Sequence, residues 1–137
     1  MNYWLVKSEP DVFSFQQLIK DQRTVWDGVR NYQARNNLRL MKMGDLVLFY
    51  HSNIGLEVVG IAKVSKEHFP DISAEKGDWS AVELQPVKPL TNSVPLAVIK
   101  KDDELKNILL VRNGRISVMP LDEKEFMHIL KLSETSL

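Results

Sequence analysis

The sequence contains no cysteine among its 137 residues. This absence excludes a disulfide framework, a zinc site made of thiolates and a cysteine nucleophile. Histidine is also scarce, and the three that occur, His51, His68 and His128, lie far apart in the chain. Because a metal site needs clustered ligands, the sequence predicts no bound metal, and no pattern indicates another cofactor.

An excess of charge and a long apolar run are missing too. The 18 lysines and arginines balance 18 aspartates and glutamates, so the formal net charge is zero. This balance argues against holding long nucleic acid by bulk electrostatics, although it allows a local basic site. No run approaches the roughly 18 apolar residues of a membrane span, and the first ten residues include Lys7 and Glu9. We expect no membrane partner and a cytoplasmic protein, or a nuclear one in a eukaryote.

Motifs of catalysis and of phosphate binding are absent as well. There is no Gly-x-Ser-x-Gly elbow, no Walker loop and no Gly-x-Gly-x-x-Gly. His51-Ser52 suggests nucleophilic catalysis, but neighbouring residues on a strand point to opposite faces. We therefore predict no catalytic residue and a protein that is not an enzyme. The alternative is an enzyme acting on a nucleotide or small ligand, with His51 as acid or base and Glu9 or Asp45 orienting it.

The apolar patterns that are present predict one domain over residues 1–137, since two would be too small. Strands are predicted at residues 3–7, 46–50, 57–66, 79–87 and 116–119. Helices are predicted at residues 15–21, 95–100, 103–110 and 122–132, with one more through Ala34, Leu38 and Met41, and the tail 133–137 is predicted to be frayed. Five or six short strands interleaved with short helices favour a β-rich mixed α/β barrel-like domain.

Local signals sharpen some of these boundaries. Ser14 with Gln17 predicts a capping box, and so does Asp122 with Glu125. Gly60, inside a run rich in β-branched residues, indicates a bulge or a close approach of another backbone segment. These signals predict where two helices begin and where one strand is irregular.

Two prolines and a polar segment mark the middle of the chain. Pro86 and Pro89 predict the end of the strand that begins near Trp79. The segment 68–79 contains proline and glycine and is longer than most connections. Long loops on compact domains often carry function, so we expect this one to lie near a site.

Large aromatic side chains stand among polar residues at four positions, Trp26, Tyr32, Tyr50 and Trp79. This combination can stack on a nucleobase and read its edge. Tyr50, like Trp4, is as consistent with the core as with binding, because half-buried aromatics favour strands. Trp26 lies beside Asp27-Gly28 without an apolar run around it, which favours a pocket wall.

Three arginines, Arg30, Arg35 and Arg39, follow Trp26 within the same mixed stretch. They can grip phosphates or form the solvated face of a helix. For Arg39 we prefer the solvated face. Charge and hydrogen-bonding capacity therefore concentrate just before the helix through Ala34, and function is expected there.

Four separated segments carry a resemblance to a known family. They are WLVKSEP at 4–10, WDGVRNYQARN at 26–36, GD at 44–45 with FYHS at 49–52, and RISVMP at 115–120. In this order they resemble the EVE domain, and the resemblance covers essentially the whole chain. Ile116 stands where leucine is expected, a change that alters packing only slightly.

The resemblance implies a PUA-like fold, an open β-barrel of five to six strands surrounded by short helices and related to YTH domains. It also implies a non-catalytic module that recognises a modified nucleobase, such as a 5-methylcytosine derivative, in DNA or RNA. The base is expected to flip out of its strand into a pocket beside the barrel. The predicted partner is therefore nucleic acid, while protein partners stay open.

Carried over by motif, the base-binding pocket is lined from four segments. These contribute Lys7, Ser8 and Glu9; Trp26, Val29, Arg30 and Asn31; Tyr50, His51 and Ser52; and Ser117, Val118, Met119 and Pro120. Amide and carboxylate groups would read the base edge, Trp26 or Val29 would contact a methyl group, and Arg30 and Arg35 would hold phosphates. A protein-interaction module whose partner covers the Trp26 loop is the remaining alternative.

Overall fold

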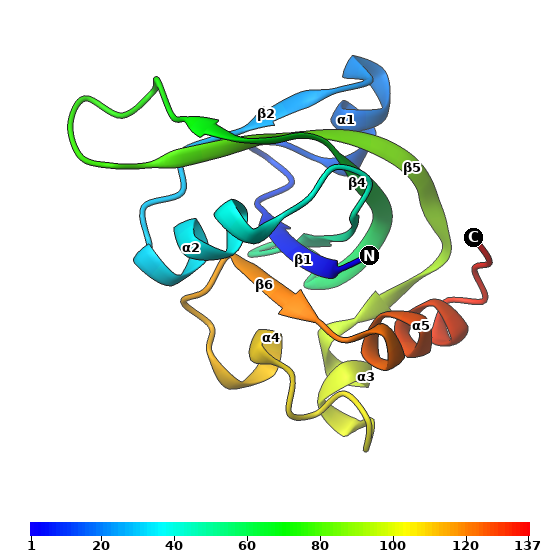
Figure 1. The fold of residues 1–137 in the computed structure, drawn as a ribbon. Coiled ribbons are helices and arrows are strands. Elements are labelled where there is room, and N and C mark those ends of the chain that lie inside the picture. The colour runs from blue at the N-terminus through cyan, green and yellow to red at the C-terminus, as the bar shows by residue number, and fades with distance from the viewer.

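The computed structural model describes residues 1–137 and is built on one mixed sheet of six strands (Figure 1). The strands are β1 (Tyr3–Ser8), β2 (Thr24–Trp26), β3 (Leu46–His51), β4 (Glu57–Pro70), β5 (Ser80–Pro95) and β6 (Val118–Leu121). Their order is β2-β5-β4-β3-β1-β6, and only β1 and β3 pair in parallel. The long β4 and β5 curve strongly, but β2 and β6 at the edges do not pair with each other. The barrel is therefore open, which confirms the predicted fold class.

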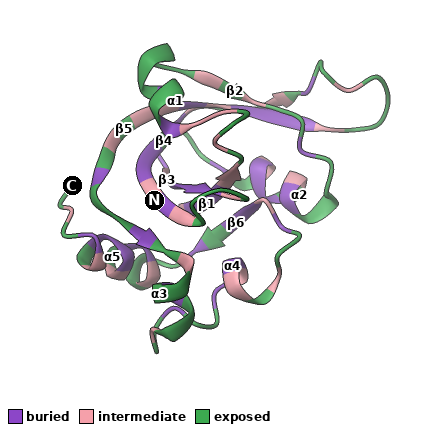
Figure 2. Ribbon diagram, turned by 180° about the vertical axis from the view of Figure 1, so that it is seen from behind, coloured by how far each residue is buried: buried purple, intermediate pink, exposed green.

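Five helices cover the sheet: α1 (Phe15–Asp21), α2 (Tyr32–Leu40), α3 (Leu96–Lys101), α4 (Leu109–Arg112) and α5 (Glu123–Leu132). Buried residues follow the strands and the inner sides of α2 and α5, as Figure 2 shows. None of these helices is long and apolar enough to cross a membrane.

The hydrophobic core is divided in two by the sheet. A first core of 15 buried residues surrounds Phe49 and receives Phe15 from α1 and Leu38 from α2. A second core of 17 buried residues surrounds Phe126 and is covered by α3, α4 and α5. Along β1, Trp4 belongs to the first core and Leu5 to the second. This alternation follows from the two-residue period of a strand.

The strand β5 is longer than predicted because it continues through Pro86 and Pro89 to Pro95. The prediction that these prolines end the strand is therefore wrong. They pair with Ala62 and Gly60 of β4, where the register of the two strands shifts. Proline is tolerated at such irregular points because the regular ladder of hydrogen bonds is already interrupted there. The strand β4 is also longer than predicted, since it runs to Pro70, and this shortens the loop between the two strands to residues 71–79.

Helix capping follows the sequence at one end of the chain and departs from it at the other. In α5 the amide of Glu125 donates to Asp122 Oδ1 at 2.7 Å, and Glu125 Oε1 accepts from the Asp122 amide at 2.9 Å. The capping box is therefore confirmed. Before α1, Ser14 Oγ accepts from the Gln17 amide at 3.1 Å, but the Gln17 side chain donates to Asp21 instead. The first box is therefore only half formed.

Three other segments differ from the predictions. The predicted helix at 103–110 is wrong, since residues 103–107 form turns and α4 begins only at Leu109. Thr24–Trp26 forms β2, whose three residues are too few to show a period. The tail is not frayed, because Ser133 is fully buried and its carbonyl accepts from the Asn92 amide at 3.1 Å.

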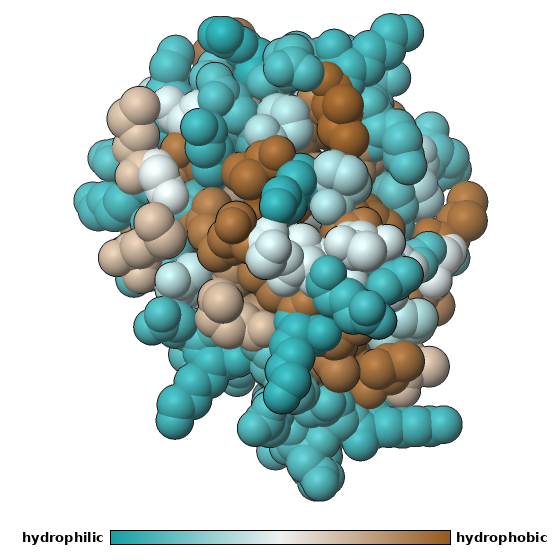
Figure 3. All heavy atoms as spheres, turned by 90° about the vertical axis from the view of Figure 1, so that its right-hand side faces the viewer, coloured by the Kyte–Doolittle hydropathy of each residue, from teal (hydrophilic) through white to brown (hydrophobic).

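Figure 3 shows the side of the molecule away from the 71–79 loop, where apolar side chains are surrounded by hydrophilic ones. The loop itself projects on the opposite side, beyond the ends of β4 and β5 (Figure 1). At the start of this loop, Asp71 accepts hydrogen bonds from Gly28 and Arg30, two residues that line a cavity.

Candidate functional site

A cavity of about 670 Å³ opens beside the sheet, on the side of the first core. It lies between the end of β1, the segment leading into α1, the strand β2 and the turn before α2. This volume is within the range of small-molecule sites. The residues that line it are Lys7, Ser8, Val12, Phe13, Thr24, Val25, Trp26, Asp27, Gly28, Val29, Arg30, Asn31 and Ser117. Seven residues named from the sequence are in this set: Lys7, Ser8, Trp26, Val29, Arg30, Asn31 and Ser117.

The indole of Trp26 forms an aromatic wall of the cavity. Its ring meets Phe49 edge-on at a centroid distance of 5.5 Å and Phe13 at 6.2 Å. Edge-to-face contacts with two other rings hold the indole in one orientation. A ring held in this way offers its remaining surface to a ligand without first having to be ordered.

Polar groups from two segments, the end of β1 and the turn before α2, line the same cavity. Asn31 Oδ1 accepts from the Ala34 amide at 2.9 Å and so caps α2, which leaves the Asn31 Nδ2 donors for a ligand. Lys7 Nζ donates to the Gly114 carbonyl at 3.0 Å, and burial lowers the pKa of Lys7 from its ordinary value. The Ser8 hydroxyl donates to the Phe13 carbonyl. The cavity therefore carries both apolar surface and fixed hydrogen-bonding groups.

Several lining residues were not named from the sequence. Thr24 and Val25 come from β2, and Val12 and Phe13 come from the segment before α1. Asp27 brings a carboxylate to the cavity, whereas Glu9 was the only carboxylate among the pocket residues predicted from the sequence. The strand β2 is too short to be predicted from a pattern of apolar residues. Its polar neighbour Asp27 was therefore the one sequence signal that this segment faces a site.

A buried carboxylate, Asp71, fixes the turn beside the cavity. Its side chain is fully shielded from solvent and accepts from the Gly28 amide and from Arg30 Nη1, each at 2.9 Å. It also accepts from the amide and the hydroxyl of Ser73. Burial raises the pKa of Asp71, but the hydrogen bonds from Ser73, Arg30 and Gly28 outweigh burial and hold this pKa far below its usual value. Asp71 thus fastens the 71–79 loop to the turn before α2.

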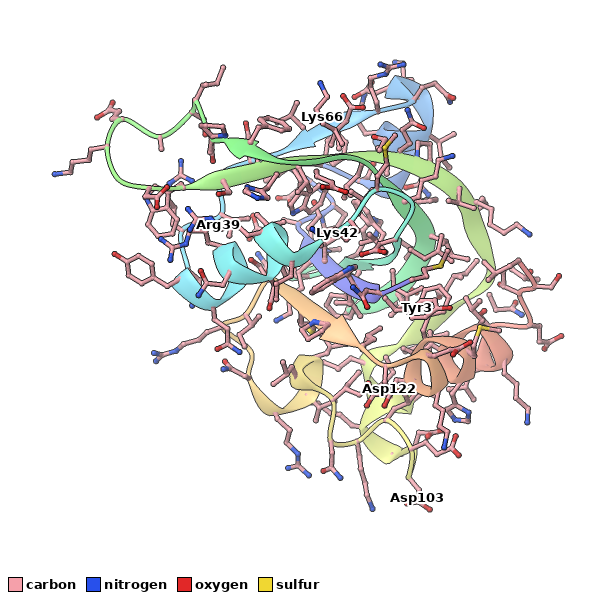
Figure 4. All side chains as sticks on the ribbon, viewed as in Figure 1. Tyr3, Arg39, Lys42, Lys66, Asp103 and Asp122 are labelled. Carbon is pink, nitrogen blue, oxygen red and sulfur yellow. The ribbon has the colours of Figure 1, made fainter.

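The predicted phosphate-binding residues, Arg30 and Arg35, both lie against the 71–79 loop. Arg30 lines the cavity, whereas Arg35 Nη1 donates to the Asp78 carbonyl at 3.1 Å. Arg39 was expected on a solvated face, and that expectation is wrong. It lies between α2 and the loop (Figure 4), pairs with the Asp78 carboxylate at 2.8 Å and donates to Ser80.

The structure does not bring the other predicted pocket residues to this cavity. Tyr50 and Met119 are buried in the second core, on the far side of the sheet, because their strand positions alternate with those that face the first core. Val118 is fully buried in the first core. Pro120 is exposed on the edge strand β6, opposite Trp4.

His51, Ser52 and Glu9 also lie outside the cavity. His51 is 8% exposed, and its Nε2 accepts from the Phe15 amide at 3.1 Å. Burial lowers the pKa of His51, and the carboxylate of Glu57, its partner on β4, opposes part of that shift. Ser52 donates its amide to the Ser8 carbonyl, and Glu9 accepts from Asn53.

The geometry gives the enzyme alternative no support. Asp45 precedes β3 and His51 ends it, so the length of the strand separates them by roughly 20 Å. The Asp45 carboxylate accepts from Trp4 Nε1 at 3.0 Å and from the Lys42 amide at 2.9 Å. Its role is therefore to hold the start of β3, and it does not orient His51.

One group of possible metal ligands, Asp102, Glu104 and His128, does come together away from the cavity. His128 Nε2 lies 2.8 Å from Asp102 Oδ2 and His128 Nδ1 lies 2.8 Å from Glu104 Oε2. The two carboxylates contact different ring nitrogens, so both nitrogens of His128 are already engaged within the group. The hydrogen bond from His128 lowers the pKa of Asp102. The separation of 26 residues between Asp102 and His128 hid this group from the sequence.

The open mixed barrel with a ligand-sized cavity beside it defines a PUA-like domain. The YTH domain of the Zygosaccharomyces rouxii MRB1 protein, solved with N6-methyladenosine RNA, shares this fold with a TM-score of 0.61 at 16% identity. That match covers 99% of this chain and 88% of the YTH chain. The chain belongs to the EVE domain family, whose model matches residues 2–132.

Relatives within the family are much more similar. Thymocyte nuclear protein 1 of Mus musculus is 39% identical, over 98% of this chain and 74% of the relative. Protein Atu2648 from Agrobacterium tumefaciens has a TM-score of 0.95 at 40% identity, over 98% of this chain and 94% of that chain. The human THYN1 protein, solved in complex with DNA containing 5-methylcytosine, has a TM-score of 0.90 at 37% identity, and the match covers both chains completely.

Proposed function

We propose that this protein is a non-catalytic reader of a modified nucleobase, which it accepts into the cavity beside Trp26. The observation that carries the proposal is the cavity itself, where an immobilised aromatic ring stands beside polar groups that have hydrogen-bonding capacity to spare. A base needs this combination, a surface to stack on and groups that read its edge. The human relative bound to DNA with 5-methylcytosine supports this choice of ligand.

Each wall of the cavity has a role in the proposal. Trp26 stacks on the base, and Asp27 accepts from an exocyclic amine such as that of cytosine. The Nδ2 group of Asn31 donates to a ring nitrogen or carbonyl of the base. Val29, which is nearly buried in the wall, and Phe13 supply the apolar contact that a methyl group needs. Because the cavity is enclosed by protein on several sides, the base has to leave its stack to enter.

The proposal excludes a chemical step for a physical reason. His51 has its only free acceptor nitrogen committed to a backbone amide and lies outside the cavity. Asp45 and Glu9, the carboxylates considered as its partners, are engaged elsewhere. Binding alone is therefore the activity that this arrangement supports.

The test is fluorescence-anisotropy binding to short single- and double-stranded DNA and RNA oligonucleotides, each with one modified or unmodified base. We expect one modified probe, with 5-methylcytosine as the first candidate, to bind most tightly. Since stacking contributes roughly 1–3 kcal/mol per base, Trp26→Ala is expected to weaken that binding by about 5- to 150-fold. Trp26→Phe, which keeps an aromatic ring, is expected to retain part of the affinity.

Met127→Ala serves as the matched control, because Met127 is exposed on α5. This helix packs on the second core, away from the cavity. It is expected to bind as the wild type does. Thermal unfolding of each variant checks that the fold is intact. Weak binding that is equal for all probes and unchanged in Trp26→Ala would overturn the proposal.

A further inference from the structure

Beside the cavity lies a group of four side chains, Tyr32, Trp79, Arg30 and Arg35, which we call the aromatic–arginine cluster. The rings of Tyr32 and Trp79 stack with their centroids 5.1 Å apart and their planes at 17°. The Arg35 guanidinium lies 5.0 Å from the Tyr32 ring and 5.7 Å from the Trp79 ring, and Arg30 lies 5.5 Å from the Trp79 ring. Two cations thus flank one aromatic stack.

The cluster is held on both sides by parts of the chain already described. Tyr32 opens α2 directly after the capping residue Asn31, and Trp79 ends the 71–79 loop. Asp71 ties that loop to Arg30, and the Asp78 carbonyl accepts from Arg35. The cluster is therefore ordered before any ligand arrives.

Burial does not explain the position of Tyr32. Its side chain belongs to neither core, and the residue is 67% exposed at the surface while Trp79 is half-buried. Holding the loop would require only Trp79 and the arginines. An exposed aromatic ring with a fixed orientation and a cation beside it is instead the arrangement that binds unstacked nucleotides.

Hydrogen-bonding capacity also remains in the cluster. A guanidinium has five N–H donors, and Arg35 uses three of them, two on Asn36 Oδ1 and one on the Asp78 carbonyl. The remaining N–H groups can bind a phosphate oxygen. Arg30 belongs to the cavity wall as well as to the cluster, so the two sites are continuous.

We propose that the aromatic–arginine cluster is a second subsite, which binds the nucleotide next to the recognised base in the same strand. The base of that nucleotide stacks on the exposed face of Tyr32, and its phosphate is held by Arg35. This inference rests on the proposed function, since the neighbouring nucleotide is defined by the base in the cavity. It adds that the ligand spans at least two nucleotides and that the second base is unstacked from its own strand.

The experiment uses single-stranded DNA probes that carry one 5-methylcytosine, with a normal or an abasic nucleotide on its 5′ or 3′ side. Binding is measured by anisotropy for wild type, Tyr32→Ala and Tyr32→Phe. Leu40→Ala, which truncates another exposed side chain of α2, is the matched control. Both Tyr32 and Leu40 are exposed, so these variants are expected to unfold at the wild-type temperature.

We expect Tyr32→Ala to bind the complete probe about 5- to 20-fold more weakly, while Tyr32→Phe and Leu40→Ala bind as the wild type does. Replacing the neighbouring nucleotide on one side by an abasic one is expected to weaken binding to the wild type by the same factor. The same replacement is expected to leave the affinity of Tyr32→Ala unchanged. If Tyr32→Ala binds as tightly as the wild type while Trp26→Ala still binds more weakly, the second subsite is overturned and the proposed reading of the modified base stands. An equal loss in Tyr32→Ala on normal and abasic probes would overturn the stacking role. If the wild type does not prefer the modified probe, the proposed function fails and the subsite fails with it.

Discussion

The imidazole of His51 is kept neutral by its surroundings. Its Nε2 accepts the Phe15 amide hydrogen, which requires that nitrogen to be unprotonated. The bond ties the end of β3 to the first turn of α1, directly behind the segment that lines the cavity. His51 therefore stabilises the fold through this hydrogen bond and is not part of the binding surface.

A pH dependence follows from this environment. Because burial lowers the folded-state pKa of His51 below the unfolded value near 6.5, the unfolded chain binds more protons between the two values. The stability contributed by neutral His51 is complete above about pH 6.5 and is lost as the pH falls toward the lowered pKa. We expect the free energy of unfolding, measured with urea from pH 7.5 to pH 5, to fall less in His51→Leu than in the wild type.

At pH 7.5 the His51→Leu variant is expected to lose about 1–3 kcal/mol, because the Phe15 amide is left without its acceptor. His68→Gln provides the control, since His68 is exposed and its replacement is expected to keep the wild-type pH slope. Equal slopes in the wild type and His51→Leu would contradict the assigned role of His51.

At the scale of elements, α1 and β4 meet without any gap. A Cβ atom built on Gly60 would lie 2.3 Å from Cζ of Phe15, whose ring is buried and cannot move into solvent. The bulge expected at Gly60 is confirmed by the register shifts beside it, and the close neighbour is the side chain of Phe15 where the sequence suggested backbone. Glycine is thus required by packing, because only a residue without a side chain lets α1 sit on the curved β4.

Gly60→Ala is expected to lower the free energy of unfolding by about 2 kcal/mol, since the buried ring has to shift. Urea unfolding measures the loss. In the double variant Phe15→Leu/Gly60→Ala the smaller side chain makes room for the new methyl group. The double variant is therefore expected to lose less stability than the sum of the losses in the two single variants. Gly114→Ala, where no atom lies within 4 Å of the new Cβ, is expected to be neutral. Strict additivity in the double variant would contradict a direct clash.

At the scale of the whole molecule, the net charge of zero limits how nucleic acid is held. The cations in or beside the cavity are Lys7, Arg30 and Arg35, and Arg30 is already paired with Asp71. Binding therefore depends on the pocket more than on counterion release. A protein that makes six or more phosphate contacts shows a far steeper dependence on salt.

We expect the logarithm of the association constant for a single-stranded probe to fall with the logarithm of salt concentration with a slope of about −1.4 to −2. This corresponds to two or three neutralised phosphates at about 0.7 each. Arg35→Gln is expected to reduce the slope by about 0.7, whereas Lys131→Gln, exposed on α5, leaves it unchanged. Anisotropy titrations from 50 to 300 mM salt measure both, and a slope of −4 or steeper in the wild type would contradict a pocket-dominated interaction.

Patterns that lie within a short stretch of the chain were determined by the sequence. The strands β1, β3 and β4 and the cap of α5 follow from neighbouring residues. So does the concentration of polar groups between Trp26 and Asn31. The resemblance of four segments to the EVE domain also lay in the sequence alone.

Tertiary structure decided what depends on distant partners. Pro86 and Pro89 stay within β5 only because β4 shifts its register opposite them, and β2 exists only because β5 offers it an edge. The packing of Tyr50 in the second core depends on residues far from it in the chain. The same is true of the hydrogen bond between His51 and Phe15 and of the contacts of Asp71 with Gly28 and Arg30. Local propensity carries no information about such pairs, because their energies arise only when the folded chain brings the two partners together.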